Sequence, residues 1–119
     1  MSYDNNNIFA KILRHEVPNN TVYEDDHVLA FHDINPASSV HVLVIPKGSY
    51  VDADDFSTNA SAKEIAGFWQ GVTAAVRSVG LMDDGYRLIV NTGANGVQEV
   101  PHYHVHILGG GRLGPMVHR

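Results

Sequence analysis

The chain has 119 residues, of which 44% are hydrophobic and 18% charged, enough apolar material for one folded domain, and this composition excludes a disordered chain. A formal net charge of −5 argues against nucleic acid as a partner, and the absence of cysteine excludes disulfide scaffolds, thiolate zinc sites and cysteine nucleophiles. The amino terminus lacks the pattern of a signal peptide and no apolar run approaches the ~20 residues of a membrane span, so we expect a cytoplasmic protein with no membrane partner.

The first predicted elements are a tail and a short helix. Residues 1–6 are polar and predict a mobile tail. Asn7 stands at the position of a helix cap, and Pro18 ends the helical pattern that follows it. The apolar face of this helix consists of Ile8, Phe9, Ile12 and Leu13. We therefore expect a short N-terminal helix that buries one face.

Three strand patterns come next. "TVYED" and "HVLAFHDI" are typical of two short strands joined by an acidic turn at Asp25 and Asp26. "INPASS" is typical of a loop. "VHVLVIPK", residues 40–47, is nearly continuous apolar sequence, which indicates a central strand of a sheet.

A loop and one long helix are predicted after these strands. Residues 51–60 are rich in Asp, Ser and Thr and predict a loop. Ser61-x-x-Glu64 is a capping-box pattern, and Gly80 is suited to end the helix that it opens.

The apolar face of the long helix is wide. Its core stripe recurs at helical spacing and consists of Ile65, Phe68, Val72, Ala75 and Val79. Trp69 and Val76 widen this stripe. The width suits either a broad core helix or a helix that packs both on its own sheet and on a second subunit, and we favour the second subunit.

The last predicted elements complete an α+β fold. "DDG" predicts a turn, "YRLIVNTG" a strand, and "ANGVQEV" a loop into a final strand. Consecutive strands with two helices predict an antiparallel meander of about five strands, with one short N-terminal helix and one long helix. The whole chain, residues 1–119, is expected to form this single domain.

The stretch "PHYHVHILGGG", residues 101–111, places three histidines at every second position and then three glycines. On a strand, His102, His104 and His106 would share one face. Such a row is open to four interpretations: a solvent-exposed polar face, an affinity tag, a metal site completed by His41, or an anion site. In the anion site an imidazole is the nucleophile, and glycines with nearby amides hold a phosphate.

The surroundings of the row favour the anion site. A metal site usually needs a carboxylate or carbonyl to hold each imidazole, whereas the partners in reach by sequence are Asn91, Gln98 and the backbone of residues 109–111. Adjacent imidazoles cannot all be cationic, so one should stay neutral and nucleophilic near pH 7 while another stays an acid. This division suits a covalent phosphoryl-type transfer.

The stretch "HYHVHIL" resembles the H-x-H-x-H signature of the histidine triad (HIT) superfamily. Over residues 7–117, further segments resemble the Hint branch, the purine nucleoside phosphoramidases, and above all its bacterial-type members. These segments are "IFAKILRHEVPNNTVYEDDHVLAFHDINP", "HVLVIPK", "DDGYRLIVNTG" and "GGGRLGPM". The uridylyltransferase branch carries Gln where this chain keeps His106, and the dinucleoside polyphosphate hydrolases resemble the flanking segments poorly.

The resemblance implies a HIT-like fold and a mechanism. His104 would attack the α-phosphorus of a nucleoside 5′-phosphoramidate, such as an AMP-amine, AMP-lysine or acyl-adenylate, and form a nucleotidyl-histidine that water hydrolyses. His102 would orient His104, His106 would contact the phosphate and help protonate the leaving group, and His41 would be the outlying fourth histidine. It also implies a homodimer, with residues 112–119 near the partner's site, and neither a metal nor a cofactor.

The resemblance further implies a purine nucleotide as ligand, of the AMP or GMP type. Asp33 would bind the ribose hydroxyls, and Asn91 and the Gln98–Glu99 segment would hold the phosphate. The apolar slot for the base would consist of Ile8, Phe9, Phe31 and Ile34. From the residues alone, a core role for each of these apolar side chains is the rival interpretation.

Three positions depart from the branch and bear on the choice of substrate. Many relatives carry Ser where this chain has Glu99, an aromatic residue where it has Pro101, and Gly where it has Val97. The alternatives to a phosphoramidase are a purine-nucleotide-binding regulatory module with incidental hydrolysis, or a dinucleoside polyphosphate hydrolase.

Overall fold

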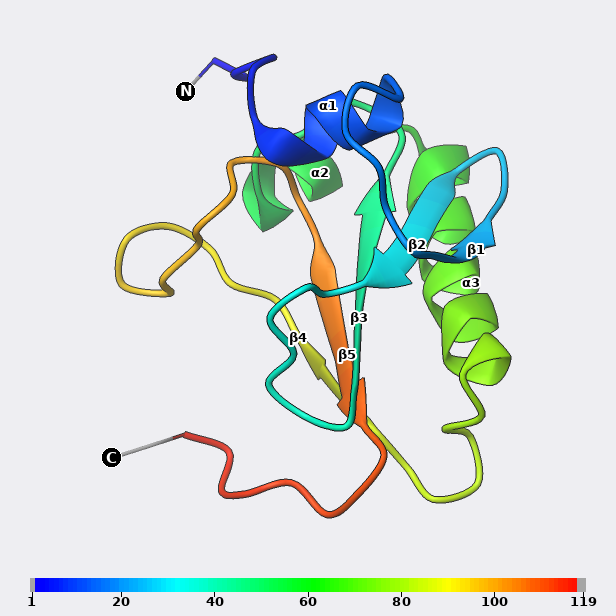
Figure 1. The fold of residues 1–119 in the computed structure, drawn as a ribbon. Coiled ribbons are helices and arrows are strands. Elements are labelled where there is room, and N and C mark those ends of the chain that lie inside the picture. The colour runs from blue at the N-terminus through cyan, green and yellow to red at the C-terminus, as the bar shows by residue number, and fades with distance from the viewer. Residues whose placement is uncertain (1, 118–119) are drawn as a thin grey trace.

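The computed structural model describes residues 2–117 as an antiparallel sheet with helices on both faces (Figure 1). The helices are α1 (Ile8–Leu13), α2 (Ala53–Asn59) and α3 (Ala62–Ser78). The strands are β1 (Thr21–Glu24), β2 (Val28–His32), β3 (Val40–Pro46), β4 (Arg87–Ile89) and β5 (Val105–Gly109). The predicted α+β class is confirmed. Residue 1 of the predicted tail and residues 118–119 of the predicted C-terminal segment lie outside the described residues.

The strands follow the order β1-β2-β3-β5-β4, and each neighbouring pair is antiparallel. The predicted simple meander is therefore wrong for the last two strands, because β5 lies between β3 and β4 (Figure 1). The central place suits β5, since its Val105 and Ile107 are completely buried, whereas Leu88 of β4 is 40% exposed. An edge strand tolerates that exposure better than a central one.

The long helix α3 begins and ends as predicted. The Ser61 hydroxyl accepts from the backbone N–H of Glu64 at 3.0 Å, and the Glu64 carboxylate accepts from the backbone N–H of Ser61 at 3.1 Å. Gly80 has a φ of 73°, the left-handed conformation that glycine adopts without strain after a helix end. The capping box and the glycine thus set both ends of α3.

The main contacts of α3 are with β1, β2 and β3. Its apolar face forms the larger core with the inward residues of the sheet, among them Val28, Val44 and Ile107. Val76 is completely buried in this core, so a role for Val76 at a second subunit is wrong. Trp69, by contrast, leaves 40% of its surface exposed.

Residues 53–59 form the helix α2, where a loop was predicted. The Asp52 side chain accepts from the backbone N–H of Asp55 at 2.9 Å, and acidic side chains in the first turn complement the helix dipole. The helix buries a single side chain, Phe56, which stacks on Tyr103 with ring centroids 4.8 Å apart. One buried residue leaves no apolar periodicity, so only the Asp cap signals this helix in the sequence.

The opposite face of the sheet carries α1 and a smaller apolar cluster. Asn7 caps α1 by accepting from the backbone N–H of Ala10 at 2.9 Å, as predicted. The cluster consists of Phe9, Ile12, Leu29, Phe31, Leu43 and Ile45. Ile8, on the predicted buried face of α1, is 43% exposed. Both faces of the sheet are thus covered over much of their area, and helices α3 and α1 lie on different faces.

The amino-terminal residues 2–6 contact the domain, although the sequence predicts a mobile tail there. The Tyr3 hydroxyl lies 2.6 Å from Nδ1 of His102, and the backbone carbonyl of Asn5 accepts from the Arg14 side chain at 2.9 Å. The mobility of this segment stays a prediction. Within residues 2–117, no helix combines the length and the apolarity needed to cross a bilayer.

Candidate active site

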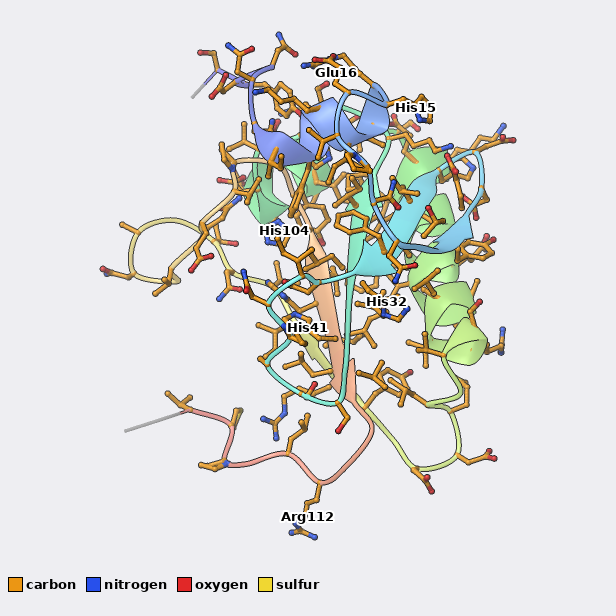
Figure 2. All side chains as sticks on the ribbon, viewed as in Figure 1. His15, Glu16, His32, His41, His104 and Arg112 are labelled. Atoms are coloured by element: carbon orange, nitrogen blue, oxygen red, sulfur yellow. The ribbon has the colours of Figure 1, made fainter. Side chains whose placement is uncertain are left out.

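A cavity of about 760 Å³ opens on the face of the sheet that carries α1. Its walls come from α1 and the turn after it, from β2 and β3, from the loop over residues 91–100, and from the residues that lead into β5. Figure 2 shows His104 beneath α1 and His41 further along the sheet on the same side. The cavity therefore joins segments from both ends of the chain.

The histidine row alternates as predicted. Tyr103, Val105 and Ile107 are buried in the core on the α3 side, while His104 and His106 line the cavity. The strand β5 begins only at Val105, so His106 alone of the three lies in the sheet ladder, opposite Leu43. The solvent-exposed face and the tag are excluded as interpretations, because His102 and His104 are buried.

The contacts of His104 determine which ring nitrogen can react. Nδ1 of His104 lies 2.7 Å from the carbonyl oxygen of His102. A carbonyl oxygen only accepts hydrogen bonds, so Nδ1 carries the proton and Nε2 keeps its lone pair. The edge of the Phe9 ring packs against the imidazole, with centroids 5.0 Å apart. His104 is thus held in the tautomer that a nucleophilic imidazole requires.

His102 is completely buried and does not line the cavity. Its Nε2 lies 3.0 Å from the carbonyl oxygen of Pro46 and therefore carries the proton. Its Nδ1 is then an acceptor, and the Tyr3 hydroxyl donates to it at 2.6 Å. His102 thus lies behind the cavity, and its backbone carbonyl accepts the hydrogen bond from Nδ1 of His104.

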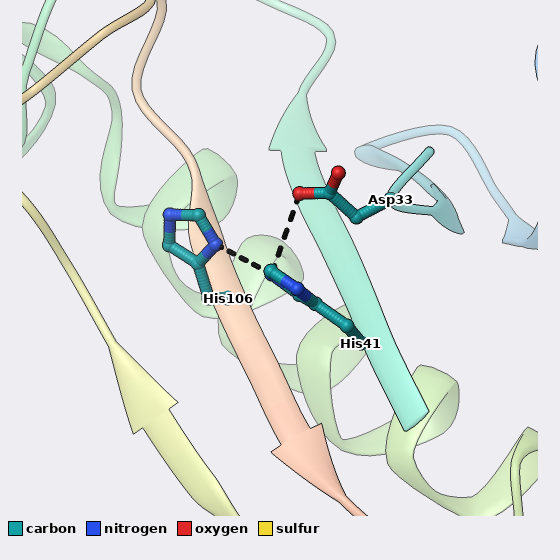
Figure 3. A group of neighbouring side chains, drawn as sticks. All are labelled: Asp33, His41 and His106. Carbon is teal, nitrogen blue, oxygen red and sulfur yellow. Dashed lines mark hydrogen bonds and ion pairs between the residues drawn. The ribbon is translucent and has the colours of Figure 1, made fainter. Parts of the chain in front are cut away.

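A second group of side chains links His106, His41 and Asp33 (Figure 3). The backbone N–H of Ala37 donates to Nδ1 of His41 at 2.9 Å, which leaves the His41 proton on Nε2. That nitrogen lies 2.9 Å from Nδ1 of His106 and 3.4 Å from the Asp33 carboxylate. His106 therefore accepts at Nδ1 and carries its own proton on Nε2.

The same three side chains could chelate a cation. One ligand atom from each of Asp33, His41 and His106 lies within 4.8 Å of the others. Two imidazoles and a carboxylate are a donor set that zinc accepts, so the residues fit a metal. In the structure the two imidazoles are already joined directly by a hydrogen bond, which satisfies the nitrogens that a metal would need.

Burial lowers the pKa of all four histidines. The pKa of His102 and that of His106 fall to about 4, and neighbouring imidazoles add to the effect. Burial also lowers the pKa of His104 and of His41, although hydrogen bonding to the His102 carbonyl opposes the shift at His104 and the Asp33 carboxylate opposes it at both. The site without ligand therefore favours neutral imidazoles, and the predicted division between a nucleophilic and an acidic histidine stays a prediction.

These shifts predict a pH dependence of stability. A buried histidine whose pKa is about 4 in the folded chain and ~6.5 in the unfolded chain stabilises fully above pH 6.5, and the stability falls as the pH drops toward 4. For His102 we expect a loss of about 3 kcal/mol at pH 4. Urea unfolding at pH 7, 6 and 5 measures the slope, which should flatten in His102→Asn. An unfolding free energy that is constant from pH 7 to 5 contradicts the shift.

The predicted base slot lies at the wall formed by α1 and β2. All four predicted side chains line the cavity, namely Ile8, Phe9, Phe31 and Ile34. Phe9 meets Phe31 edge to face, with centroids 5.6 Å apart, and both are buried. Ile34 is 92% exposed, so it stands at the rim of the cavity rather than in the core. The two phenylalanines therefore belong to the smaller core cluster and line the cavity at the same time, whereas Ile34 has no core role.

The predicted polar residues divide into two groups. Asp33, Asn91 and Glu99 line the cavity. Gln98 does not, because its amide braces the loop: Nε2 donates to the carbonyl of Val51 at 2.7 Å, and Oε1 accepts from the backbone N–H of Gly93 at 3.3 Å. The Gln98 side chain is therefore not placed to contact a phosphate in the cavity.

The glycines after the row do not line the cavity, contrary to the predicted phosphate-holding role. Gly109 pairs with Val40 in the sheet, and Gly110 turns the chain with a φ of 86°. A side chain on Gly110 would approach Cβ of Ser39 to 2.9 Å. These glycines serve the turn that follows β5.

The model of the HIT domain family matches residues 14–113, which include the histidine row and most of the cavity. The chain belongs to this family. It is a HIT family hydrolase, and the HIT-like fold predicted from the resemblance is confirmed.

Named HIT proteins are similar to the chain over most of its length. The purine nucleoside phosphoramidase of Escherichia coli is 45% identical, over 92% of both chains. A 14 kDa zinc-binding protein of Zea mays is 42% identical over 92% of this chain and 86% of its own. The structure of a HIT family hydrolase from Clostridium thermocellum superimposes with a TM-score of 0.86 at 38% identity, over 94% of this chain and 96% of its own.

Several cavity residues of this HIT hydrolase were missed by the sequence analysis. The turn after α1 supplies Asn19 and Asn20, and the end of β2 supplies His32. Turn residues show no periodicity, so nothing in the pattern marks them as part of a site.

Val97, noted as a departure, has a φ of 57°, which is strained for a β-branched residue and costs about 1–2 kcal/mol relative to glycine.

Proposed function

We propose that the protein hydrolyses the P–N bond of purine nucleoside 5′-phosphoramidates through a nucleotidyl intermediate on His104. The observation that carries the proposal is the neutral His104, with Nδ1–H held by a backbone carbonyl and Nε2 left as the nucleophile beside an aromatic slot. The phosphoramidase named among the relatives supports this substrate class. AMP-amines, AMP-lysine and acyl-adenylates are the substrates we expect.

The proposed reaction proceeds in two displacements. Nε2 of His104 attacks the α-phosphorus, the N–P bond to His104 forms, and the bond from phosphorus to the amine breaks. The leaving nitrogen takes up a proton, for which His106 is the proposed donor, because an anionic phosphate beside His106 raises its pKa again. Water then attacks the phosphorus, the bond from phosphorus to Nε2 of His104 breaks, and the water gives a proton back to His106 as the nucleoside monophosphate leaves, so that one water is consumed for each amine released.

The proposed binding mode uses the two ends of the cavity. The purine lies between Phe9 and the rim residue Ile34, and Asp33 accepts from the ribose hydroxyls. Asn91 and Glu99 lie on the loop beside His104, where the phosphate and the leaving amine meet. A carboxylate at position 99 favours a cationic leaving amine, so lysine-like amines fit this site better than neutral ones. The amide of Gln98 acts indirectly, by bracing this loop.

The proposal includes a homodimer in the cytoplasm. Tyr86, Leu88 and Val90, on or beside the edge strand β4, each leave about two-fifths of their surface exposed. Leu88 pairs with the buried Ile107 and so lies on the α3 side of the sheet, which α3 covers mainly over β1 to β3. A second copy over β4 would remove this surface from water. A chain without cysteine needs no oxidising compartment, which supports the cytoplasm.

The predicted position of the C-terminal segment near the partner's site stays part of this proposal. Arg87 of β4 donates to the carbonyl oxygens of Gly114 at 2.9 Å and Pro115 at 3.4 Å. These contacts hold the segment against the strand that we expect at the interface. Met116 is 85% exposed, which leaves it available to a partner.

Incubation with an adenosine 5′-phosphoramidate that carries a fluorescent amine tests the function. We expect release of the amine with and without exhaustive chelation, because neither displacement uses a metal. A stoichiometric zinc that is lost together with the activity would contradict the proposal and favour a metal site at Asp33, His41 and His106. Binding of AMP without turnover favours the regulatory module. Faster turnover of a diadenosine polyphosphate than of the phosphoramidate favours the polyphosphate hydrolase.

A further inference from the structure

Tyr3 is held in a defined position ahead of α1. The carbonyl of Asp4, the next residue, accepts from the side chain of Asn7 at 2.7 Å and from its backbone N–H at 3.3 Å. Asn7 is itself buried and caps α1. The segment that carries Tyr3 is therefore tied to the first helix of the domain, and the Tyr3 hydroxyl reaches across to a residue 99 positions later.

The hydrogen bond from Tyr3 to His102 has a defined direction. Nε2 of His102 is committed to the Pro46 carbonyl as a donor, so Nδ1 holds a lone pair and the Tyr3 hydroxyl must donate. The O–N distance of 2.6 Å is short for such a bond, and the two rings meet edge to face with centroids 5.6 Å apart. Tyr3 thus supports the tautomer that the Pro46 carbonyl sets, and it fixes the plane of the His102 ring.

The backbone carbonyl of His102 in turn positions His104, the proposed nucleophile. Its carbonyl accepts the Nδ1 proton of His104 at 2.7 Å, and this bond aims Nε2 of His104 at the cavity. With the ring of His102 anchored by Pro46 on one nitrogen and by Tyr3 on the other, the backbone at residue 102 has little freedom to turn. Removal of the Tyr3 hydroxyl would leave a fully buried acceptor without a partner.

We propose that Tyr3 is a positioning residue of the HIT hydrolase: its hydroxyl locks the His102 ring, and through the His102 carbonyl it keeps the His104 nucleophile aligned. Tyr3 does not line the cavity, so it acts on the chemical step and leaves nucleotide binding unchanged. The position lies in residues that the sequence marks as a tail, and only the structure relates it to the site.

The variant Tyr3→Phe tests this proposal, since it removes the hydroxyl and keeps the ring that packs on His102. The matched control is Tyr23→Phe, which removes a hydroxyl that donates to Asp25 at 2.8 Å, away from the cavity. We expect kcat of Tyr3→Phe to fall about tenfold, as for the loss of one aligning hydrogen bond, with KM and AMP affinity within twofold of the parent. The control should keep the parent's kcat.

A second measurement needs no substrate and separates this inference from the proposed function on which its kinetic part rests. In ¹⁵N spectra of the parent, His102 should show a single tautomer with the proton on Nε2 and slow exchange of that proton with water. In Tyr3→Phe we expect faster exchange and a second tautomer. Unchanged His102 nitrogen signals in Tyr3→Phe, or a kcat equal to the parent's, overturn the proposal. A parent without phosphoramidase activity overturns the proposed function, while the spectra still test the role of Tyr3.

Discussion

Replacement of His104 by glycine is expected to lower phosphoramidate turnover by roughly three orders of magnitude or more, because the covalent route depends on its Nε2. AMP binding should persist, since the aromatic slot and Asp33 are untouched. His102 and His106 variants should lose less individually, and their losses should not add to that of His104→Gly. Steady-state kinetics and calorimetric AMP titration measure the two effects separately.

The control for this variant is His15→Gly. His15 is exposed at the end of α1 and has a φ of 63°, a conformation that glycine adopts readily, so its loss removes an imidazole without strain. Figure 2 shows it at the carboxyl end of α1, away from His104. Rapid quenching of the parent should trap the nucleotide on residue 104. A His104→Gly variant with near-normal turnover, or a nucleotide trapped on another residue, contradicts the covalent mechanism.

Charge reversal at the exposed apolar surface should abolish the proposed dimer. Leu88→Glu and Trp69→Glu each place a carboxylate where we expect the second copy, and an unpaired charge buried in an interface should raise the dimer dissociation constant about 100-fold or more. Light scattering at micromolar concentration should give twice 13.0 kDa for the parent and the single mass for each variant. Both side chains are already half-exposed in one chain, so each variant should still fold.

Lys63→Glu is the matched control for these reversals. Lys63 is exposed in the first turn of α3 and points away from the Trp69 face, so its reversal should leave the dimer intact. A monomeric parent at micromolar concentration contradicts the dimer directly. If Leu88→Glu stays dimeric while Trp69→Glu dissociates, the interface lies on α3 and excludes the β4 edge.

Helix ends and strand faces that are marked by neighbouring residues could be predicted from the sequence. Asn7, the capping box at Ser61 and Gly80 each act within one helical turn, and the structure confirms all three. The period of two in the histidine row likewise predicted that His104 and His106 face the cavity, away from the core. These are short-range effects of backbone geometry, so they can be recognised from neighbouring residues alone.

Effects that depend on distant partners could not be recognised in the same way. The order of β4 and β5 depends on which strand buries more of its side chains, and Val76 belongs to the core because α3 packs against β1, β2 and β3. The loop role of Gln98 depends on Val51, which is 47 positions away. His102, predicted beside its neighbours in the row, is enclosed by Tyr3 and Pro46 from two other parts of the chain.

The central position of β5 affects the stage of synthesis and folding at which the enzyme can become active. β5 is the last strand of the described chain to be synthesised, yet it must insert between β3 and β4, which are made earlier. Until then β3 presents an open apolar edge, and the pairing that closes it is long-range and hence slow to form. The strand that completes the sheet also brings His106 and, just before it, His104, the proposed nucleophile. We therefore expect that a nascent chain has no hydrolase activity before β5 has paired, and that activity appears only when the sheet is complete.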